Sequence, residues 1–81
     1  MNSILDFTVH AETMMHERGI LDEWVMDTVS SPDKTEERRD DEKHYLKKIR
    51  SAGGKTLRVV INPLKDPPRV ITAFFDRRIK V

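Results

Sequence analysis

The spacing of apolar residues changes once along this chain, near Ser30, and this change restricts the fold more than any other feature. Before Ser30, residues suited to a buried face recur three and four positions apart, as on one side of an α-helix. They are Ala11, Met14 and Met15, followed by Leu21, Trp24, Val25, Thr28 and Val29. Later in the chain, Leu57, Val59 and Ile61 alternate with other residues, as in a β-strand. Helices followed by strands predict an α+β domain.

The residues around these patterns set the expected limits of the elements. Thr8 is expected to cap a helix over 9–18, and Gly19 to end it in a left-handed conformation. A second helix is expected over 21–29, and a hairpin turn at Gly53-Gly54. The other expected elements are a short strand within 3–7, an exposed strand or loop over 34–42, and strands over 43–50, 56–61 and 70–75. We therefore expect a short N-terminal strand and two helices packed on one face of a small antiparallel sheet of three to four strands, with the other face open.

The chain has 81 residues and no cysteine, so we expect a single domain over residues 1–81 with a thin core and no disulfide or thiolate-metal site. No apolar run approaches the roughly 20 residues that cross a bilayer. The first residues lack the basic stretch and apolar run of a secretory signal. These observations predict a cytoplasmic protein with no membrane segment.

The net charge of +1 conceals an uneven distribution of charge along the chain. Up to Glu42 there are four basic and twelve acidic residues, a net charge of −8, whereas from Lys43 on there are eleven basic and two acidic residues, a net charge of +9. Such asymmetry favours a surface for nucleic acid or for an acidic partner. On this interpretation the sheet carries the cations and the acidic residues face water. The alternative is that the acidic half lies against the basic half and cancels its field.

Short motifs along most of the chain resemble a family of small bacterial proteins, the domain of unknown function 4258. The motifs are His10-Ala11 with Met15 and Arg18-Gly19-Ile20, the spacing to Val25 and Ser31-Pro32-Asp33, the run Lys55-Thr56-Leu57-Arg58-Val59-Val60, and Val70-Ile71-Thr72. The resemblance spans roughly residues 7 to 75. This family looks related to the fold of RelE-type toxins, barnase and other bacterial toxin nucleases.

The resemblance implies a RelE-like scaffold for a metal-independent, toxin-like endoribonuclease that needs no cofactor. It would act on RNA through the open sheet face and the start of the first helix, with an antitoxin or another acidic protein as a partner. Two other functions stay open. One is a non-catalytic module that holds nucleic acid or an acidic protein on the basic sheet. The other is an interaction protein whose acidic and basic halves pair between copies, so that the chain is a homodimer and not a monomer.

Four residues are candidates for catalysis, because RNA cleavage without a metal needs a base, an acid and cations around the phosphate. His10 is the candidate base or acid: the helix dipole favours a neutral imidazole in the first turn, and the resemblance puts a functional residue here. The alternative is that His10 only covers the helix start. Lys47 and Arg58 would stabilise the phosphate. Thr72 would orient the substrate or form an internal hydrogen bond.

Four further residues are candidates for binding RNA. Arg18 would hold a phosphate with its planar guanidinium, or else interact with the last carbonyl groups of its own helix. Arg50 would join Lys47 and Arg58 in a cationic sheet face if the strand registers agree. His44 and Tyr45 precede Lys47 and Arg50 on the same strand, and Tyr45 would stack on a base or pack in the sheet, with packing favoured.

No metal site is expected. His10 and His16 are six residues apart, which on a helix does not give the four-residue spacing of a zinc-binding pair. The acidic run from Glu36 to Glu42 lacks the glycine and the ligand spacing of a calcium loop. The arginines of this run, Arg38 and Arg39, are expected to be solvated and neutralised by the acids around them.

Overall fold

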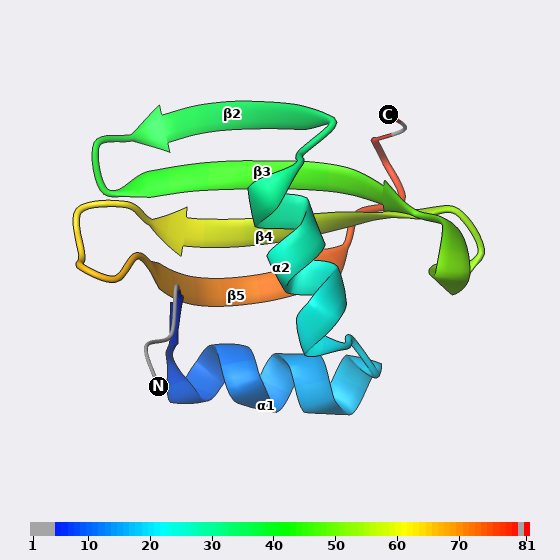
Figure 1. The fold of residues 1–81 in the computed structure, drawn as a ribbon, viewed down its shortest axis with the longest axis horizontal. Helices are drawn as coiled ribbons and strands as arrows, with labels where there is room; N and C mark the ends of the chain where they lie inside the picture. Colours follow the sequence, from blue (N-terminus) through cyan, green and yellow to red (C-terminus); the bar gives the residue numbers. More distant parts are fainter. Residues whose placement is uncertain (1–4, 80) are drawn as a thin grey trace.

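The computed structural model describes residues 5–79 and 81 and confirms the predicted α+β class. The elements are β1 (Asp6–Phe7), α1 (Val9–Arg18), α2 (Asp22–Ser30), β2 (Lys34–Arg39), β3 (Glu42–Ile49), the 3-10 turn η1 (Arg50–Ala52), β4 (Lys55–Asn62) and β5 (Arg69–Phe75). The strands form one open sheet in the order β1-β5-β4-β3-β2, in which β1 runs parallel to β5 and the other neighbours are antiparallel (Figure 1). Residues 3 and 4 of the expected first strand lie outside the described residues.

Helix α1 has the two ends that the sequence predicted. The Thr8 hydroxyl accepts a hydrogen bond of 3.0 Å from the backbone N–H of Ala11, which otherwise has no partner in the first turn. Gly19 follows the last turn with φ of 65°, a left-handed conformation that glycine adopts without strain. Its N–H and that of Ile20 donate back to carbonyls of the last turn, so the helix ends there.

Helix α1 lies along β5, whereas α2 crosses the strands β3, β4 and β5 on one face of the sheet (Figure 1). The Thr8 hydroxyl donates to the carbonyl of Ile71 over 3.1 Å, and Arg18 Nη1 donates to the carbonyl of Ala73 over 3.2 Å. The short β1 pairs only with Arg69 and Val70. Both ends of α1 are therefore fixed to the part of β5 that β1 leaves unpaired.

The core lies between the helices and the α2-facing side of the sheet. The alternating residues Leu57, Val59 and Ile61 of β4 point into it as predicted, and each is almost completely buried. Both helices contribute buried residues, and Trp24 of α2 meets the ring of Phe75 edge-on, with 6.1 Å between ring centroids. The remaining members of this core cluster are Leu5, Ala11, Met15, Ile20, Val25, Ile49, Val70 and Ala73.

The sheet is wider than the predicted three to four antiparallel strands, because the charged segment after α2 forms strand β2. The sequence predicts either an exposed strand or a loop over residues 34–42. Residues Lys34–Arg39 pair antiparallel with β3, and five of these six residues are exposed. An edge strand that buries few side chains does not need alternating apolar residues. The sequence alone therefore does not distinguish it from a loop, and its pairing with β3 identifies it.

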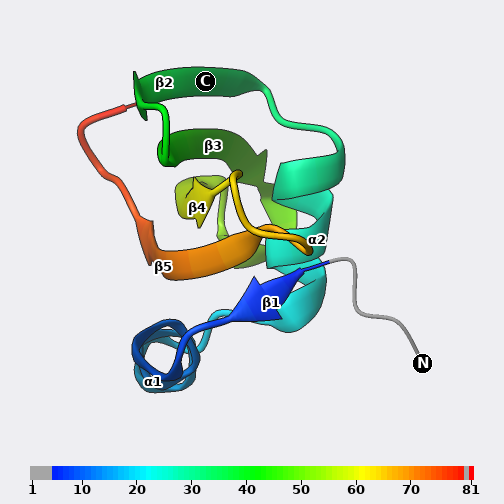
Figure 2. The ribbon, with the colours of Figure 1, turned by 90° about the vertical axis from the view of Figure 1, so that its left-hand side faces the viewer.

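No helix covers the face opposite α2 within the described residues, and the chain after β5 passes over it near one end of the strands (Figure 1). Figure 2 shows the sheet from one end of its strands, with α2 on one side and the chain after β5 on the other. This chain begins at Asp76, whose N–H donates to the carbonyl of Thr56 over 2.8 Å. In the described part of the chain, neither helix is long and apolar enough to cross a membrane.

We expect the substitution Thr8→Ala to lower the free energy of unfolding by about 1–2 kcal/mol, because it removes both the helix cap and the bond to the Ile71 carbonyl. Urea titration at neutral pH measures this. Thr13→Ala is the matched control, since Thr13 is exposed within the same helix. An equal loss in both variants would show that neither hydrogen bond contributes specifically.

Candidate functional site

The candidate site lies on the sheet face opposite α2, where two rows of directly opposed residues cross strands β2 to β5. Residues opposite each other in neighbouring strands share a face. The first row is Glu36, His44, Val60 and Thr72, and the second is Lys34, Leu46, Arg58 and Phe74. Three residues that the sequence singled out separately, His44, Arg58 and Thr72, therefore lie on this one face.

Arg58 is the centre of a polar network on this face. Its side chain is only 4% exposed, and that of its partner Asp76 is 1% exposed. Arg58 Nε donates to Asp76 Oδ2 over 2.9 Å, and Nη1 donates to Glu36 Oε1 over 3.0 Å. Arg38 and Arg78 reach the same two carboxylates from outside. A buried guanidinium needs such partners, because an uncompensated charge in the interior is strongly destabilising.

His44 is held between Arg58 and Glu42 in a way that fixes its tautomer. Arg58 Nη1 lies 2.7 Å from His44 Nδ1, and His44 Nε2 lies 2.8 Å from Glu42 Oε2. A guanidinium only donates, so Nδ1 must accept and carry no proton. The proton of the neutral ring is then on Nε2, from which it is donated to the carboxylate of Glu42. The ring is 12% exposed and presents an unprotonated nitrogen beside a cation.

One nitrogen of Arg58 has unused donors. Among the described residues, none accepts a hydrogen bond from Arg58 Nη2, although Nε and Nη1 are both engaged. The two N–H groups of Nη2 suit an oxygen of a phosphate, which guanidinium groups bind in their plane.

Two carboxyl groups of the network stay ionised far below neutral pH. Hydrogen bonds from Arg58 and Arg38 lower the pKa of Glu36 to about 2. Hydrogen bonds from Arg78, and then from Arg58, lower the pKa of Asp76 to about 2 against the cost of burial. The hydrogen bond from His44 likewise lowers the pKa of Glu42. At neutral pH the network therefore contains charged carboxylates around a charged guanidinium.

Phe74 stands directly opposite Arg58 on the neighbouring strand. Its side chain is half-buried and does not belong to the core cluster or to the hydrophobic residues packed against it, unlike the adjacent Phe75. The site thus combines an aromatic ring, a guanidinium with free donors and an unprotonated imidazole nitrogen on adjacent strands.

The register separates Lys47 and Tyr45 from Arg58. Lys47 is opposite Leu57 and Tyr45 is opposite Val59, so both lie on the α2 side of the sheet. Lys47 Nζ donates to the carbonyl of Ser31 after α2, over 2.8 Å. Tyr45 packs against the core, with Lys43 Nζ 5.1 Å from its ring centroid, which agrees with the packing alternative. Lys47 and Arg58 therefore do not form the cationic face that the sequence allowed.

The candidates on and near α1 lie apart from the network. His10 is exposed in the first turn of α1, and no hydrogen bond or ion pair joins its side chain to another described residue. Arg18 does not bind the last carbonyl groups of its own helix, because its Nη1 donates to a carbonyl of β5. Arg50 is exposed in the turn η1, at the end of β3.

The acidic and basic residues occupy different halves of the sequence, but on this face they are not separated in space. The expectation was that acidic residues before Glu42 face water while the sheet carries the cations. Strand β2 instead brings Glu36 to Arg58, and β1 brings Asp6 to Arg69, with 3.1 Å between Nε and Oδ2. The physical reason is that the acidic segment is itself a sheet strand. Acidic and basic residues therefore alternate here, as in the alternative interpretation.

Sequence reasoning missed Glu36, Glu42 and Asp76 as members of the site. The first two belong to a run that looked uniformly solvated, and Asp76 stood at the start of a basic tail. Only one signal was present: Asp76 is one of two acids after Lys43, so it has many basic residues to pair with. Within the described residues, no three metal-binding side chains cluster as a metal site would require.

The fold and this network define a small α+β domain with a polar site on one sheet face. Comparison with protein families gives a match to the domain of unknown function DUF4258 over residues 7–75, and the chain belongs to that family. The predicted family membership is thus confirmed. No curated protein and no solved structure matches the chain.

We expect acid to destabilise the protein through Asp76. Its pKa is about 2 in the folded protein and near 3.8 when unfolded, so the unfolded chain binds a proton first as pH falls. The stability that the carboxylate contributes is complete well above pH 3.8 and is lost as pH approaches 2. Urea titrations across this range should show the fall.

The variant Asp76→Asn should lose about 3–5 kcal/mol of stability at neutral pH, because it breaks a buried ion pair from one side. The free energy of unfolding of this variant should also decrease less steeply with falling pH than that of the natural sequence. Asp41→Asn, in the exposed turn between β2 and β3, is the control and should change neither. A wild-type acid profile in Asp76→Asn would refute the assignment.

Proposed function

We propose that this protein is a metal-independent endoribonuclease that acts on single-stranded RNA at the face opposite α2. The observation that carries the proposal is the arrangement around Arg58: the unprotonated Nδ1 of His44 lies 2.7 Å from Nη1, while Nη2 has no acceptor among the described residues. A base next to a phosphate-binding cation is what cleavage at a 2′-hydroxyl requires.

In the proposed reaction, the 2′-oxygen of a nucleotide attacks the adjacent phosphorus, and the bond to the 5′-oxygen of the next nucleotide breaks. The 2′-hydroxyl first replaces Arg58 Nη1 as the hydrogen-bond donor to His44 Nδ1, which then takes its proton, while Glu42 stabilises the imidazolium through Nε2. Arg58 donates to the phosphate oxygens on which negative charge grows. The leaving 5′-oxygen takes a proton from the imidazolium or from water. The products are a 2′,3′-cyclic phosphate and a 5′-hydroxyl.

Asp76 and Thr72 have supporting roles in this proposal. Asp76 fixes the guanidinium at Nε, so that Nη1 and Nη2 keep a constant direction. Thr72 lies in the same row as His44, two strands away, and its hydroxyl suits a contact to the ribose or phosphate. A toxin of this type would be held inactive by an antitoxin, and we extend the proposal to such a partner.

A non-catalytic RNA-binding module is the second candidate function. The observation in its favour is that His44 Nδ1 already accepts a hydrogen bond from Arg58 Nη1, so that its lone pair is not free to take a proton from RNA. In that case the face would hold RNA without releasing cyclic phosphate.

The decisive experiment is incubation of the pure protein with single-stranded RNA in excess chelator. We expect fragments with 2′,3′-cyclic phosphate ends, and a rate about 10²–10⁴-fold lower for His44→Gln, as for loss of a general base. His16→Gln, on exposed α1, is the matched control. Intact RNA with salt-sensitive binding would support the binding module instead. Loss of activity in His10→Gln but not in His44→Gln would move the base to α1.

We expect Phe74 to stack on an unpaired base beside the cleaved phosphate. Replacing an aromatic ring that stacks on a base weakens binding by about 1–3 kcal/mol. Phe74→Leu should show this loss with a short, non-cleavable RNA strand, and Phe74→Tyr should retain affinity. Tyr45→Leu removes an aromatic ring on the α2 side and serves as control. Equal affinity of Phe74→Leu and wild type, measured by fluorescence anisotropy, would exclude stacking.

A further inference from the structure

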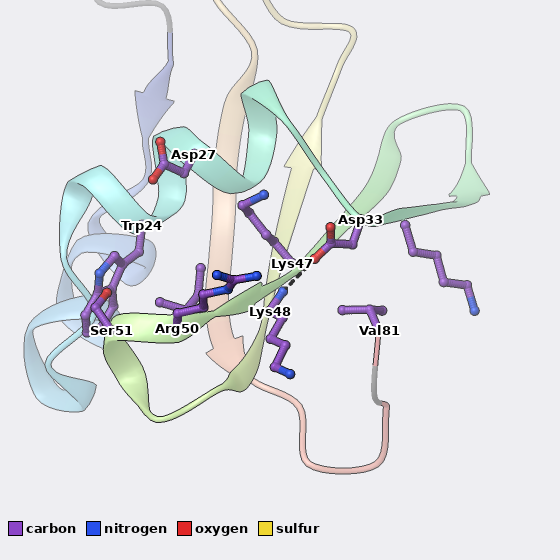
Figure 3. A pocket seen from close by; sticks show the side chains of 10 residues that line it. Trp24, Asp27, Asp33, Lys47, Lys48, Arg50, Ser51 and Val81 are labelled. Carbon is purple, nitrogen blue, oxygen red and sulfur yellow. Dashed lines mark hydrogen bonds between the residues drawn. The ribbon is translucent and has the colours of Figure 1, made fainter.

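A second, basic region lies around the end of β3, outside the site described above. It is an open hollow of about 930 Å³ between the later part of α2, the start of β2 and the turn η1. Four cations line it, Lys34, Lys47, Lys48 and Arg50, against the two carboxylates of Asp27 and Asp33. Figure 3 shows Arg50 reaching toward the middle of the hollow and Lys47 reaching toward α2.

The charges in this hollow differ in how far they are already neutralised. Lys47 Nζ is held by the Ser31 carbonyl, and the carboxylate of Asp33 accepts from the backbone N–H of Lys48 over 2.9 Å. Within the described residues, neither the ammonium of Lys48 nor the guanidinium of Arg50 has a hydrogen-bonding or ion-pairing partner. In contrast to Arg58, these two cations are exposed and available to an outside anion.

The hollow is continuous with the face that carries Arg58. Strand β2 starts opposite Leu46, so the part of β3 from Lys47 on pairs with β4 on one side and has no strand on its β2 side. Side chains alternate along this free edge: Lys48 shares the face of Arg58, whereas Lys47 lies on the side of α2. Lys34 is in the same cross-strand row as Arg58. A chain of cations therefore leads from the site around the edge of β3.

We propose that this hollow binds the backbone phosphates of the same single-stranded RNA, next to the nucleotides at Arg58. Exposed ammonium and guanidinium groups with no internal partner are suited to a polyanion, whose condensed counterions they release. The free edge of β3 gives one strand a path from the catalytic face to the hollow. This inference rests on the proposed function, which places the neighbouring nucleotides at Arg58. It concerns the binding of RNA and not its cleavage.

The test measures binding of RNA whose 2′-hydroxyls are methylated, so that no cleavage occurs. Wild type, Arg50→Gln, Lys48→Gln and the control Lys65→Gln are compared, and each variant removes one positive charge. Lys65 is exposed in the loop after β4. For a strand long enough to reach the hollow, the slope of log affinity against log salt should become shallower by about 0.7 for each lost contact. With a dinucleotide, all four proteins should bind alike.

The outcomes separate this inference from the proposed function. If RNA binding by Arg50→Gln and Lys48→Gln depends on salt as in the wild type, the hollow is not a phosphate site, even if the protein cleaves RNA. The expected change of slope upholds the inference, even if no cyclic phosphate forms. Binding of an acidic peptide, and not of RNA, at Arg50 and Lys48 also overturns it. Thermal melts of each variant verify the fold, which substitutions of exposed side chains should leave intact.

Discussion

The buried ion pair between Arg58 and Asp76 determines what the face opposite α2 presents to solvent. Arg58 comes from the middle of β4 and Asp76 from the first position after β5, and the N–H of Asp76 is also bound to the carbonyl of Thr56. The pair therefore holds the departing chain against the sheet and fixes the guanidinium. Burying two charges is expensive, and such pairs contribute little net stability compared with apolar residues. Its physical value here is orientation: Nη1 is directed to Glu36 and His44, and no described residue accepts from Nη2.

Much of the fold could be predicted from the sequence, because local chemistry determines it. Thr8 and Gly19 limit α1 through a hydroxyl acceptor and a left-handed conformation, and neither depends on distant parts of the chain. The alternation in β4 likewise identified its buried side, since any sheet that buries Leu57 and Val59 directs Arg58 away from them. The width of the sheet could not be predicted, because β2 consists of charged and polar residues that pair through their backbone alone.

The candidate site was only partly accessible to sequence reasoning, for a reason of geometry. Arg58, His44 and Thr72 were found as residue types suited to RNA, but their common face depends on the registers of three strand pairs. A shift of one residue in β3 would have brought Lys47 to that face and removed His44 from it. The carboxylates that hold Arg58 are 22 and 18 residues away in the chain, at positions that no local pattern marks.

The position of α1 along β5 has a consequence for association between molecules. An open sheet has two edges, and the unpaired backbone of an edge strand is a template on which other chains add strands and aggregate. At one edge, hydrogen bonds from Thr8 and Arg18 occupy carbonyls of β5 that an added strand would need. At the other, β2 presents charged side chains of both signs, such as Lys34 and Glu37, which oppose the approach of a second strand. Both edges of the sheet therefore oppose the addition of a strand from another molecule.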